Sequence, residues 1–406
     1  MLDKVQFLID GYPVEKDIID EFDLRSHSRN LRYSSALKSD VLDFVGFIIK
    51  DDKILAAFPK HYVSVENLSI LNEIDMSLLF NTLIKNELDK NQSYIGDLAD
   101  YESNYPFKSF FEVYKYYLNY GLFQEANNSI KPGYNGKISW KDTIRKSQVI
   151  MSQNSLILMP LYVKKMYSEQ VFLTECMAYV INHTVDKFSA FLNLKGVRGI
   201  NVQSETFKNK EFVISKLQLI YAKTFKDIEK KLIQSLMDFF KGFNEGGNMV
   251  FKHYNFELVW ESMVDGYLNT YFVGIKDGLP LFDSSLTNSS KNFKKKSFYI
   301  NSINEKHKIE PDHYCIDGSK QYIFDSKYYV DLKRIDYKQI AYHSILKSFI
   351  EGETFNVLIL PTSGESKSEY YFELNEEYYT RDVDKISIIT SHLNMKVVIE
   401  TYTQHI

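Results

Sequence analysis

Residues 311–327 constrain the fold of this chain more than any other segment, because a strong turn signal separates two apolar runs. They read Pro-Asp-His-Tyr-Cys-Ile-Asp-Gly-Ser-Lys-Gln-Tyr-Ile-Phe-Asp-Ser-Lys. Asp317-Gly318 between such runs is typical of the turn of an antiparallel β-hairpin. Successive side chains of a strand point to opposite faces, so Asp325 and Lys327 are expected on the same face.

The sequence leaves two registers of this hairpin open. In one register, residues 317–320 form the loop and Asp312 lies opposite Asp325. In the other, residues 317–318 form the loop and Asp312 lies opposite Ile323, which is on the face of Asp325. Either register places the carboxylates of Asp312 and Asp325 on the same face as Lys327. A three-residue loop would place the two carboxylates on opposite faces.

Two carboxylates and an ammonium on one face predict hydrolysis of phosphodiester bonds. Converging carboxylates bind Mg²⁺, which usually retains several waters, and the ion activates a water as nucleophile. We predict Asp312 and Asp325 as metal ligands, with the Ser326 carbonyl as a further candidate ligand. Lys327 is the predicted catalytic cation, which orients the water and stabilises developing negative charge. The alternative is an exposed hairpin held by salt bridges, with no catalytic role.

A helix is expected directly upstream, over residues 254–267. Its apolar residues recur at helical spacing, and Glu257 and Glu261 lie one turn apart at the border of the apolar stripe. A glutamate at such a border can point into a cleft and supply a third carboxylate. A solvated helix flank is the alternative for each of the two residues.

A second helix is expected to begin at Asp336, downstream of the hairpin. Asp336 has the side chain of an N-cap, and Gln339 follows three residues later, as in a capping box. Alternatively, Gln339 and Tyr342 face the DNA backbone or the metal site. Residues 355–360 are apolar apart from Asn356 and predict a buried strand. The order helix, hairpin, helix, strand predicts an α/β domain at this end of the chain.

The whole sequence predicts an α+β multidomain protein. A β-rich N-terminal domain, the expected partner contact, covers residues 1–130, and a mostly helical central region covers residues 131–245. The glycine-rich residues 242–248 form the expected boundary before an α/β domain over residues 246–406.

Within the central region, helical periodicity covers residues 169–192 and 211–240. The short apolar run at residues 156–163 predicts a buried strand. Residues 284–296 are rich in Ser, Asn and Lys, and their lysines either follow DNA phosphates or lie on a solvated loop.

Composition excludes several classes of protein. The chain carries 49 Lys and Arg against 53 Asp and Glu, so its grip on nucleic acid must come from a local patch or a partner. Its 2 cysteines are too few for a disulfide framework or a zinc ribbon. No apolar run approaches the ~20 residues of a membrane span, and the N-terminus lacks the pattern of a signal peptide. We therefore expect a cytoplasmic protein without membrane contact.

The motifs together resemble the McrC-like nuclease subunits of McrBC-type restriction systems, and most closely the LlaJI restriction family. These subunits belong to the PD-(D/E)xK superfamily. One departure is Ser326, because the family usually has alanine between the acid and the lysine. The matching stretches are residues 45–49, 58–62 and 135–144, Trp260-Glu261, Pro311-Asp312, 325–327 and 337–342.

The resemblance implies a Mg²⁺-dependent nuclease subunit that cuts double-stranded DNA and works with an AAA+ NTPase of the McrB type. It favours Glu261 over Glu257 as the third carboxylate. The sequence lacks a phosphate-binding loop of the form G-x-x-x-x-G-K-[ST], in agreement with a separate motor subunit. A stand-alone or repair nuclease is the alternative enzyme, and a non-catalytic adaptor that stimulates the NTPase is the alternative without catalysis.

Overall fold

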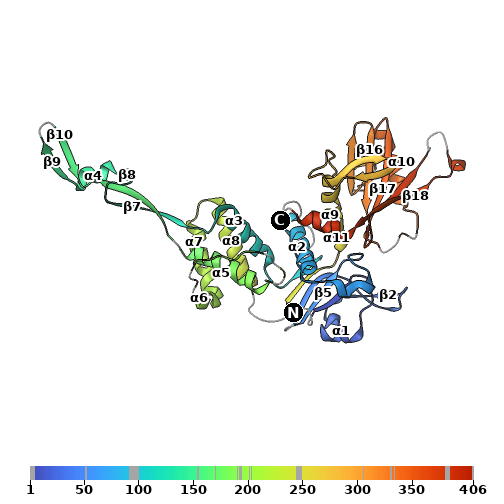
Figure 1. The fold of residues 1–406 in the computed structure, drawn as a ribbon, viewed down its shortest axis with the longest axis horizontal. Coiled ribbons are helices and arrows are strands. Elements are labelled where there is room, and N and C mark those ends of the chain that lie inside the picture. The colour runs from blue at the N-terminus through green and yellow to red at the C-terminus, as the bar shows by residue number, and fades with distance from the viewer. Residues whose placement is uncertain are drawn as a thin grey trace. The chain divides into compact units, whose positions relative to one another are not determined.

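A computed structural model shows a mixed α/β protein with several sheets and helices, in agreement with the expected α+β class (Figure 1). It divides into two compact units: Met1–Tyr105, Ala190–Asn193 and Asn244–Ile406 form the first, and Pro106–Ser189 and Leu194–Phe243 form the second. None of the described helices is long and apolar enough to cross a membrane. The described residues are 5–50, 53–90, 100–152, 155–169, 171–189, 191, 194–200, 202, 204–243, 249–304, 306–329, 332, 334–379 and 385–404.

An N-terminal sheet of the first unit has the strand order β1-β5-β4-β12-β6. The strand β4 pairs with β5 in antiparallel register, and Lys50 lies opposite Lys53. Gly46 on β4 is required by close packing: its φ is +140°, and a Cβ there would lie 2.1 Å from the Phe251 carbonyl oxygen. The bounds are β1 Val5–Ile9, β5 Lys53–Phe58, β4 Val45–Lys50, β12 Met249–His253 and β6 Tyr101–Ser103.

The strand β12 explains why these units differ from the domains expected from the sequence. It follows the second unit along the chain, yet it pairs with β4 near the middle of the N-terminal sheet. A boundary at residues 245–246 therefore assigns this strand to the wrong sheet. Residues 244–248 of the expected glycine-rich break lie outside the described residues.

A second sheet of the first unit has the order β15-β16-β17-β19-β18. The strands β16, β17 and β19 are parallel, and the two edge strands are antiparallel to their neighbours. The middle of β17, residues 356–361, is buried and apolar apart from Asn356, as a strand covered on both faces requires. The bounds are β15 His313–Asp317, β16 Lys320–Ser326, β17 Glu353–Thr362, β19 Ser387–Asn394 and β18 Lys367–Glu373.

Helices and a short ribbon surround this second sheet. The helix α9 precedes the β15–β16 hairpin and α10 connects it to β17, so the expected order helix, hairpin, helix, strand is confirmed. The helices α2, α9 and α11 pack against one another, and the β13–β14 ribbon follows α9. The bounds are α9 Phe256–Tyr271, α10 Tyr337–Leu346, α2 Glu73–Lys90, α11 Met395–Thr403, β13 Phe272–Lys276 and β14 Leu279–Phe282.

The second unit contains a group of helices with an aromatic-rich core. The single helix expected over residues 211–240 is two helices, α7 and α8, because Thr224 and Lys226 adopt extended backbone between them. The break lets both helices pack against each other with their apolar faces inside. The bounds are α3 Phe107–Tyr120, α5 Phe172–Lys187, α6 Ser204–Lys208, α7 Lys210–Lys223 and α8 Asp227–Gly242.

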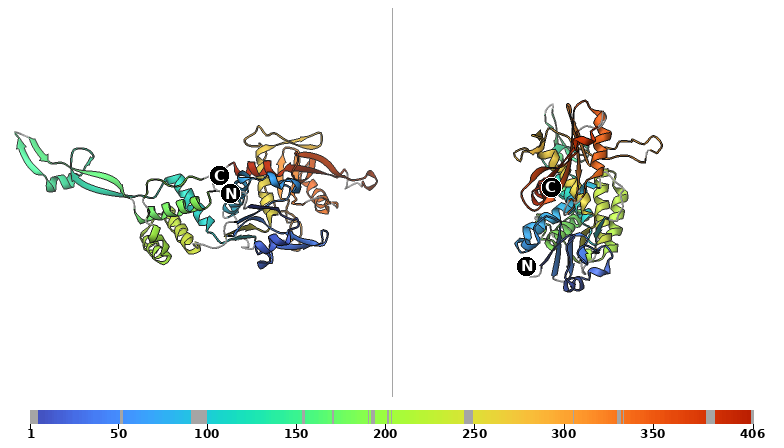
Figure 2. Two further views of the ribbon diagram at one scale, coloured as in Figure 1. Left: turned by 60° about the horizontal axis from the view of Figure 1, so that its bottom comes forward. Right: turned by 90° about the vertical axis from the view of Figure 1, so that its right-hand side faces the viewer.

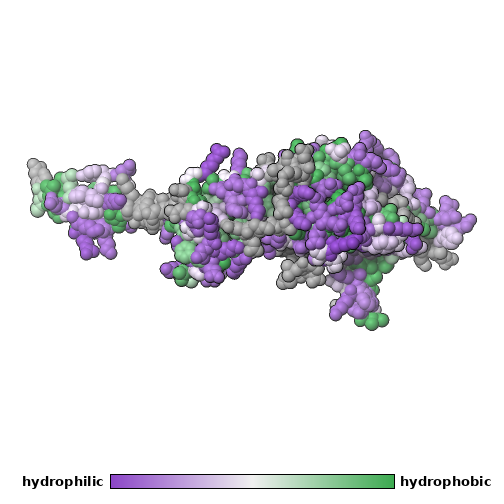
Figure 3. Space-filling model, turned by 90° about the horizontal axis from the view of Figure 1, so that it is seen from below, coloured by the Kyte–Doolittle hydropathy of each residue, from purple (hydrophilic) through white to green (hydrophobic). Residues whose placement is uncertain are grey.

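A β-arm, residues 125–169, leaves these helices as a ribbon of β7 and β11 (Figures 1 and 2). The expected buried strand at residues 156–163 is wrong over its first part: Leu156 is 66% exposed, because β9 and β10 form a thin hairpin, whereas Val163 on β11 is buried. Figure 3 shows hydrophobic surface beside hydrophilic surface at the far end of the arm. The bounds are β7 Glu125–Pro132, β8 Lys137–Ile138, α4 Trp140–Lys146, β9 Gln148–Ser152, β10 Ser155–Met159 and β11 Tyr162–Glu169.

Candidate active site

The β15–β16 hairpin adopts the first of the two expected registers. Ile316 pairs with Gln321, and Asp317 pairs with Lys320, so the turn consists of residues 318–319. Gly318 has a φ of +58°, which an L side chain rarely adopts. Extending this register by one position beyond the pair of residues 313 and 324 places Asp312 opposite Asp325.

Asp325 lies at the buried end of β16 between two ammonium groups. Its carboxylate forms an ion pair with Lys327, and Lys338 Nζ donates to Oδ1 at 2.9 Å. Lys327 is held in place because its backbone N–H donates to the Ile359 carbonyl of β17 at 2.8 Å. Burial alone would raise the pKa of Asp325, but the two lysines outweigh burial and lower it. Asp325 is therefore ionised at neutral pH.

Asp312 shows the opposite behaviour. Its Oδ2 accepts a hydrogen bond from the Ser326 backbone N–H at 3.0 Å. Burial, together with the Asp325 and Glu261 carboxylates, raises the pKa of Asp312 to about 6. The pKa values diverge because both close lysines contact Asp325, whereas the nearest ammonium to Asp312, Lys295, is 3.9 Å away. An excess of negative potential at Asp312 favours the binding of a cation there.

Glu261 is connected to the site by Lys295, which contacts both Glu261 and Asp312. Lys295 Nζ donates to Glu261 Oε2 at 3.2 Å, and it also faces Asp312. Glu257, the alternative on the same helix, is exposed to solvent. Among the described residues, no three or more His, Cys, Asp and Glu side chains are grouped as a metal site. The structure thus brings together Asp312, Asp325 and Lys327, while Lys295 separates Glu261 from Asp312.

The donor set fits Mg²⁺ better than a transition metal. Asp312 and Asp325 offer hard carboxylate oxygens, and Mg²⁺ in proteins is commonly held by one or two carboxylates and several waters. His313 is close to the two carboxylates but forms hydrogen bonds elsewhere. Its Nε2 lies 2.8 Å from Ser326 Oγ, and its Nδ1 lies 3.4 Å from Asp265 Oδ1. Ser326 is therefore fixed through both its side chain and its backbone.

The two candidates on α10 differ in their surroundings. Asp336 is confirmed as the N-cap, since its side chain accepts from the N–H groups of Lys338 and Gln339. Gln339 is fully buried, and neither polar atom of its amide has a partner among the described residues, so it does not complete a capping box. Tyr342 donates its hydroxyl to the Glu310 carbonyl at 3.0 Å. The Tyr342 hydroxyl therefore has a hydrogen-bond partner, whereas the Gln339 amide has none among the described residues.

The contacts of Lys338 and Lys295 with the acids were not predicted from the sequence. Lys338 is the second residue of α10, where the helix dipole disfavours a cation. That unfavourable position was the signal for a specific carboxylate partner. Lys295 lies in the polar run that was expected either to follow phosphates or to be solvated. The sign in the sequence was an apolar residue, Phe293, two positions earlier in this polar run. The structure buries Phe293, and this anchors the run.

A hollow of about 570 Å³ opens beside the carboxylates. Glu261, Asp312 and Lys295 line one part of it, and Lys85 of α2 and Tyr402 of α11 line another. Lys85 is oriented by its hydrogen bond to the Tyr402 carbonyl at 2.6 Å. The candidate active site therefore has space beside it for a substrate group, bordered by both acidic and basic side chains.

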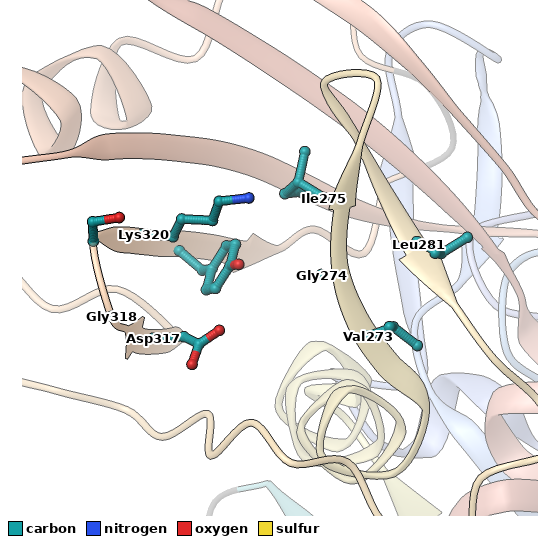
Figure 4. Close-up of a pocket in the computed structure, with 9 residues that line it drawn as sticks. Val273, Gly274, Ile275, Leu281, Asp317, Gly318 and Lys320 are labelled. Carbon is teal, nitrogen blue, oxygen red and sulfur yellow. The ribbon is translucent and has the colours of Figure 1, made fainter.

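A second hollow, of about 460 Å³, lies at the turn of the same hairpin. Asp317 and Lys320 face the β13–β14 ribbon across it, with Val273 and Leu281 on the ribbon (Figure 4). Its described lining includes none of the predicted site residues. This hollow is therefore separate from the carboxylate cluster.

Known proteins offer only distant similarity. No protein-family model and no curated protein matches the sequence. Among solved structures, the chain is similar to a chain of the refined half-complex from a tetradecameric assembly of Thermococcus gammatolerans McrB AAA+ hexamers with bound McrC. The identity is 12%, the coverage is 98% of each chain, and the TM-score is 0.40. The cryo-EM structure of the Thermococcus gammatolerans McrBC complex matches at 12% identity over 66% of this chain and 89% of that one, with a TM-score of 0.24. Likeness at this level assigns no residue a role, so function is argued from the site itself.

Proposed function

We propose that the chain is the nuclease subunit of a motor-driven restriction system and hydrolyses phosphodiester bonds of double-stranded DNA. The observation that carries the proposal is the cluster of Asp312, Asp325 and Lys327 at the end of β16. These residues come from a hairpin whose register aligns them, and their surroundings hold Asp325 ionised. The mixed sheet with α9 and α10 beside the hairpin supports assignment to the PD-(D/E)xK superfamily.

Each residue of the cluster has a distinct role in this proposal. Asp312 and Asp325 hold Mg²⁺, and the bound ion supplies an activated water and charge neutralisation. Lys327 orients the attacking water and stabilises negative charge on the phosphoryl oxygens. Lys338 keeps Asp325 ionised and fixes its Oδ1. The Ser326 carbonyl and Glu261 remain candidate ligands, Glu261 only where Lys295 has moved away from it.

We propose an AAA+ NTPase of the McrB type as the partner that recognises DNA and drives translocation. Two observations support a division of labour. The net charge of -4 gives the chain no bulk attraction to DNA. The far end of the β-arm exposes apolar side chains that a monomer usually buries, including Met151 at 79% and Leu156 at 66%. These exposed side chains favour the β-arm, rather than the N-terminal domain expected over residues 1–130, as the contact surface for the motor.

Plasmid cleavage with Mg²⁺ tests the proposal, with and without an AAA+ NTPase of the McrB type. The expected result is cutting that needs the NTPase and nucleotide and that is lost in Asp325→Ala. Site-specific cutting by the chain alone would show a stand-alone nuclease. Stimulation of the NTPase with no cutting, unchanged by Lys327→Ala, would show an adaptor.

A further inference from the structure

The polar segment at residues 284–296 is anchored beside the proposed active site. Phe293 is buried, with its ring centroid 5.1 Å from the rings of both Phe272 and Phe324. Asn269 of α9 holds the Phe293 backbone at both ends: its Oδ1 accepts from Phe293 N–H at 2.8 Å, and its Nδ2 donates to the Phe293 carbonyl at 3.2 Å. The residues that follow Phe293 therefore leave from a fixed point.

The next residues run along the edge of the second sheet. Lys294 forms an antiparallel bridge with Tyr314 of β15, with N···O distances of 3.2 and 3.0 Å. Lys296 lies over the rings of Phe298 and Tyr314, 4.9 Å from each centroid. Lys295, between them, is thus delivered to one place by backbone pairing on one side and ring contact on the other.

The Lys295 ammonium lies between two proposed metal ligands. Its Nζ is 3.2 Å from Glu261 Oε2 and 3.9 Å from Asp312 Oδ1, although its side chain is 49% exposed. The two carboxylates come from different parts of the chain, since Glu261 belongs to α9 and Asp312 directly precedes β15. A long, half-exposed lysine usually loses conformational entropy for little gain in a surface pair. Here two acids share one cation, and that cation occupies the position where an ion would bridge them.

We infer that the Lys295 ammonium takes the place of a second divalent ion, so that the site holds a single metal between Asp312 and Asp325. Two-metal nucleases place their ions about 3.5–4 Å apart, with one carboxylate shared between them. Asp312 is positioned to be that shared carboxylate, and Glu261 to be the outer ligand of the second position. A fixed ammonium there supplies positive charge to a bound phosphodiester without a second ion. This inference rests on the proposed nuclease function.

Binding of Mn²⁺ to the full chain, followed by calorimetry and by electron paramagnetic resonance of the bound ion, tests the inference. Wild type is expected to bind one Mn²⁺, and Asp325→Asn to lose it. Lys295→Met is expected to bind two, the second of comparable affinity, with an altered spectrum from spin coupling between neighbouring ions. The second ion should disappear in the double variant Lys295→Met, Glu261→Gln. Lys295→Arg should keep a single ion.

Lys294→Met is the matched control, because Lys294 lines the same hollow and its substitution removes the same charge. One ion in both Lys295→Met and wild type would overturn the inference and leave the proposed function standing. Two ions in wild type, or a second ion in Lys294→Met as well, would also overturn it. No Mn²⁺ in wild type would overturn the inference together with the proposed metal site. Circular dichroism of each variant establishes that it is folded, as the half-exposed position of Lys295 leads us to expect.

Discussion

Gln339→Met is expected to make the protein more stable and less active. The Gln339 side chain is fully buried, and neither its Oε1 nor its Nε2 has a partner among the described residues. An unsatisfied buried polar group costs about 1–3 kcal/mol. Methionine has nearly the same length and shape and no strong polar atom, so it should keep the packing and remove this cost. We expect the free energy of unfolding to rise by about 1–3 kcal/mol.

The loss of activity follows from where Gln339 lies. It directly follows Lys338, which contacts Asp325, and native proteins retain an unpaired buried amide chiefly at functional sites. We expect the amide to be used when DNA and metal are bound, and the rate of cleavage to fall by about tenfold or more on its removal. Urea unfolding measures the first effect, and single-turnover plasmid cleavage with the motor measures the second.

Gln321→Met is the matched control. Gln321 is also a fully buried glutamine, but its Oε1 accepts from Tyr314 at 2.6 Å and its Nε2 donates to Leu346 and Thr354 at 3.0 and 3.1 Å. Its replacement should therefore lower stability. If Gln339→Met is destabilised to the same extent as Gln321→Met, or is stabilised and cuts as fast as wild type, the reasoning about Gln339 is refuted.

Three further predictions concern Lys338, Asp10 and the β-arm. Lys338→Met should lower the free energy of unfolding, measured in urea, by about 1 kcal/mol. The loss should be smaller than the roughly 3–5 kcal/mol expected when a buried charge loses its only partner, because Lys338 is 46% exposed and Asp325 still pairs with Lys327. An unchanged free energy of unfolding would contradict the pairing of Lys338 with Asp325. Burial raises the pKa of Asp10 from 3.8 to about 6, so the folded state binds a proton more tightly than the unfolded state does. Stability should then fall by about 3 kcal/mol as pH rises from about 4 to about 6, and urea titrations of Asp10→Asn should lack this slope. Met151→Asp on the arm should keep Tm but lose stimulation of the NTPase, measured as phosphate release, whereas Gln148→Asp on the same strand should retain it.

Local sequence signals predicted the hairpin and its neighbours well. Asp317-Gly318 lies between apolar runs, and the observed pairing of Ile316 with Gln321 is one of the two registers that this turn allowed. The N-cap at Asp336 and the apolar strand β17 were predictable for the same reason. Each depends on interactions within a few residues, which the order of the amino acids determines directly.

Features that depend on distant residues were not predictable in this way. The strand β12 has an ordinary apolar pattern, and nothing in it indicates that its partner is β4, some two hundred residues earlier along the chain. The run at residues 156–163 is apolar, which normally indicates burial, but its first residues lie on the thin hairpin of the β-arm and are exposed. Lys295 belongs to a polar run, and the packing of Phe293 together with the pairing of Lys294 with Tyr314 brings it to Glu261. These errors share one cause, since burial and ion pairing are properties of the folded chain.

A comparison of Asp312→Asn with Asp317→Asn tests whether the hairpin carboxylates form a Mg²⁺-dependent nuclease site. Both replace a carboxylate of the same hairpin, but Asp317 is 44% exposed and pairs with Lys291 at the turn. Cleavage of plasmid DNA is measured at saturating Mg²⁺ with the motor present. We predict a loss of about a hundredfold or more in Asp312→Asn and near wild-type cutting in Asp317→Asn. Equal cutting by the two folded variants would contradict the account.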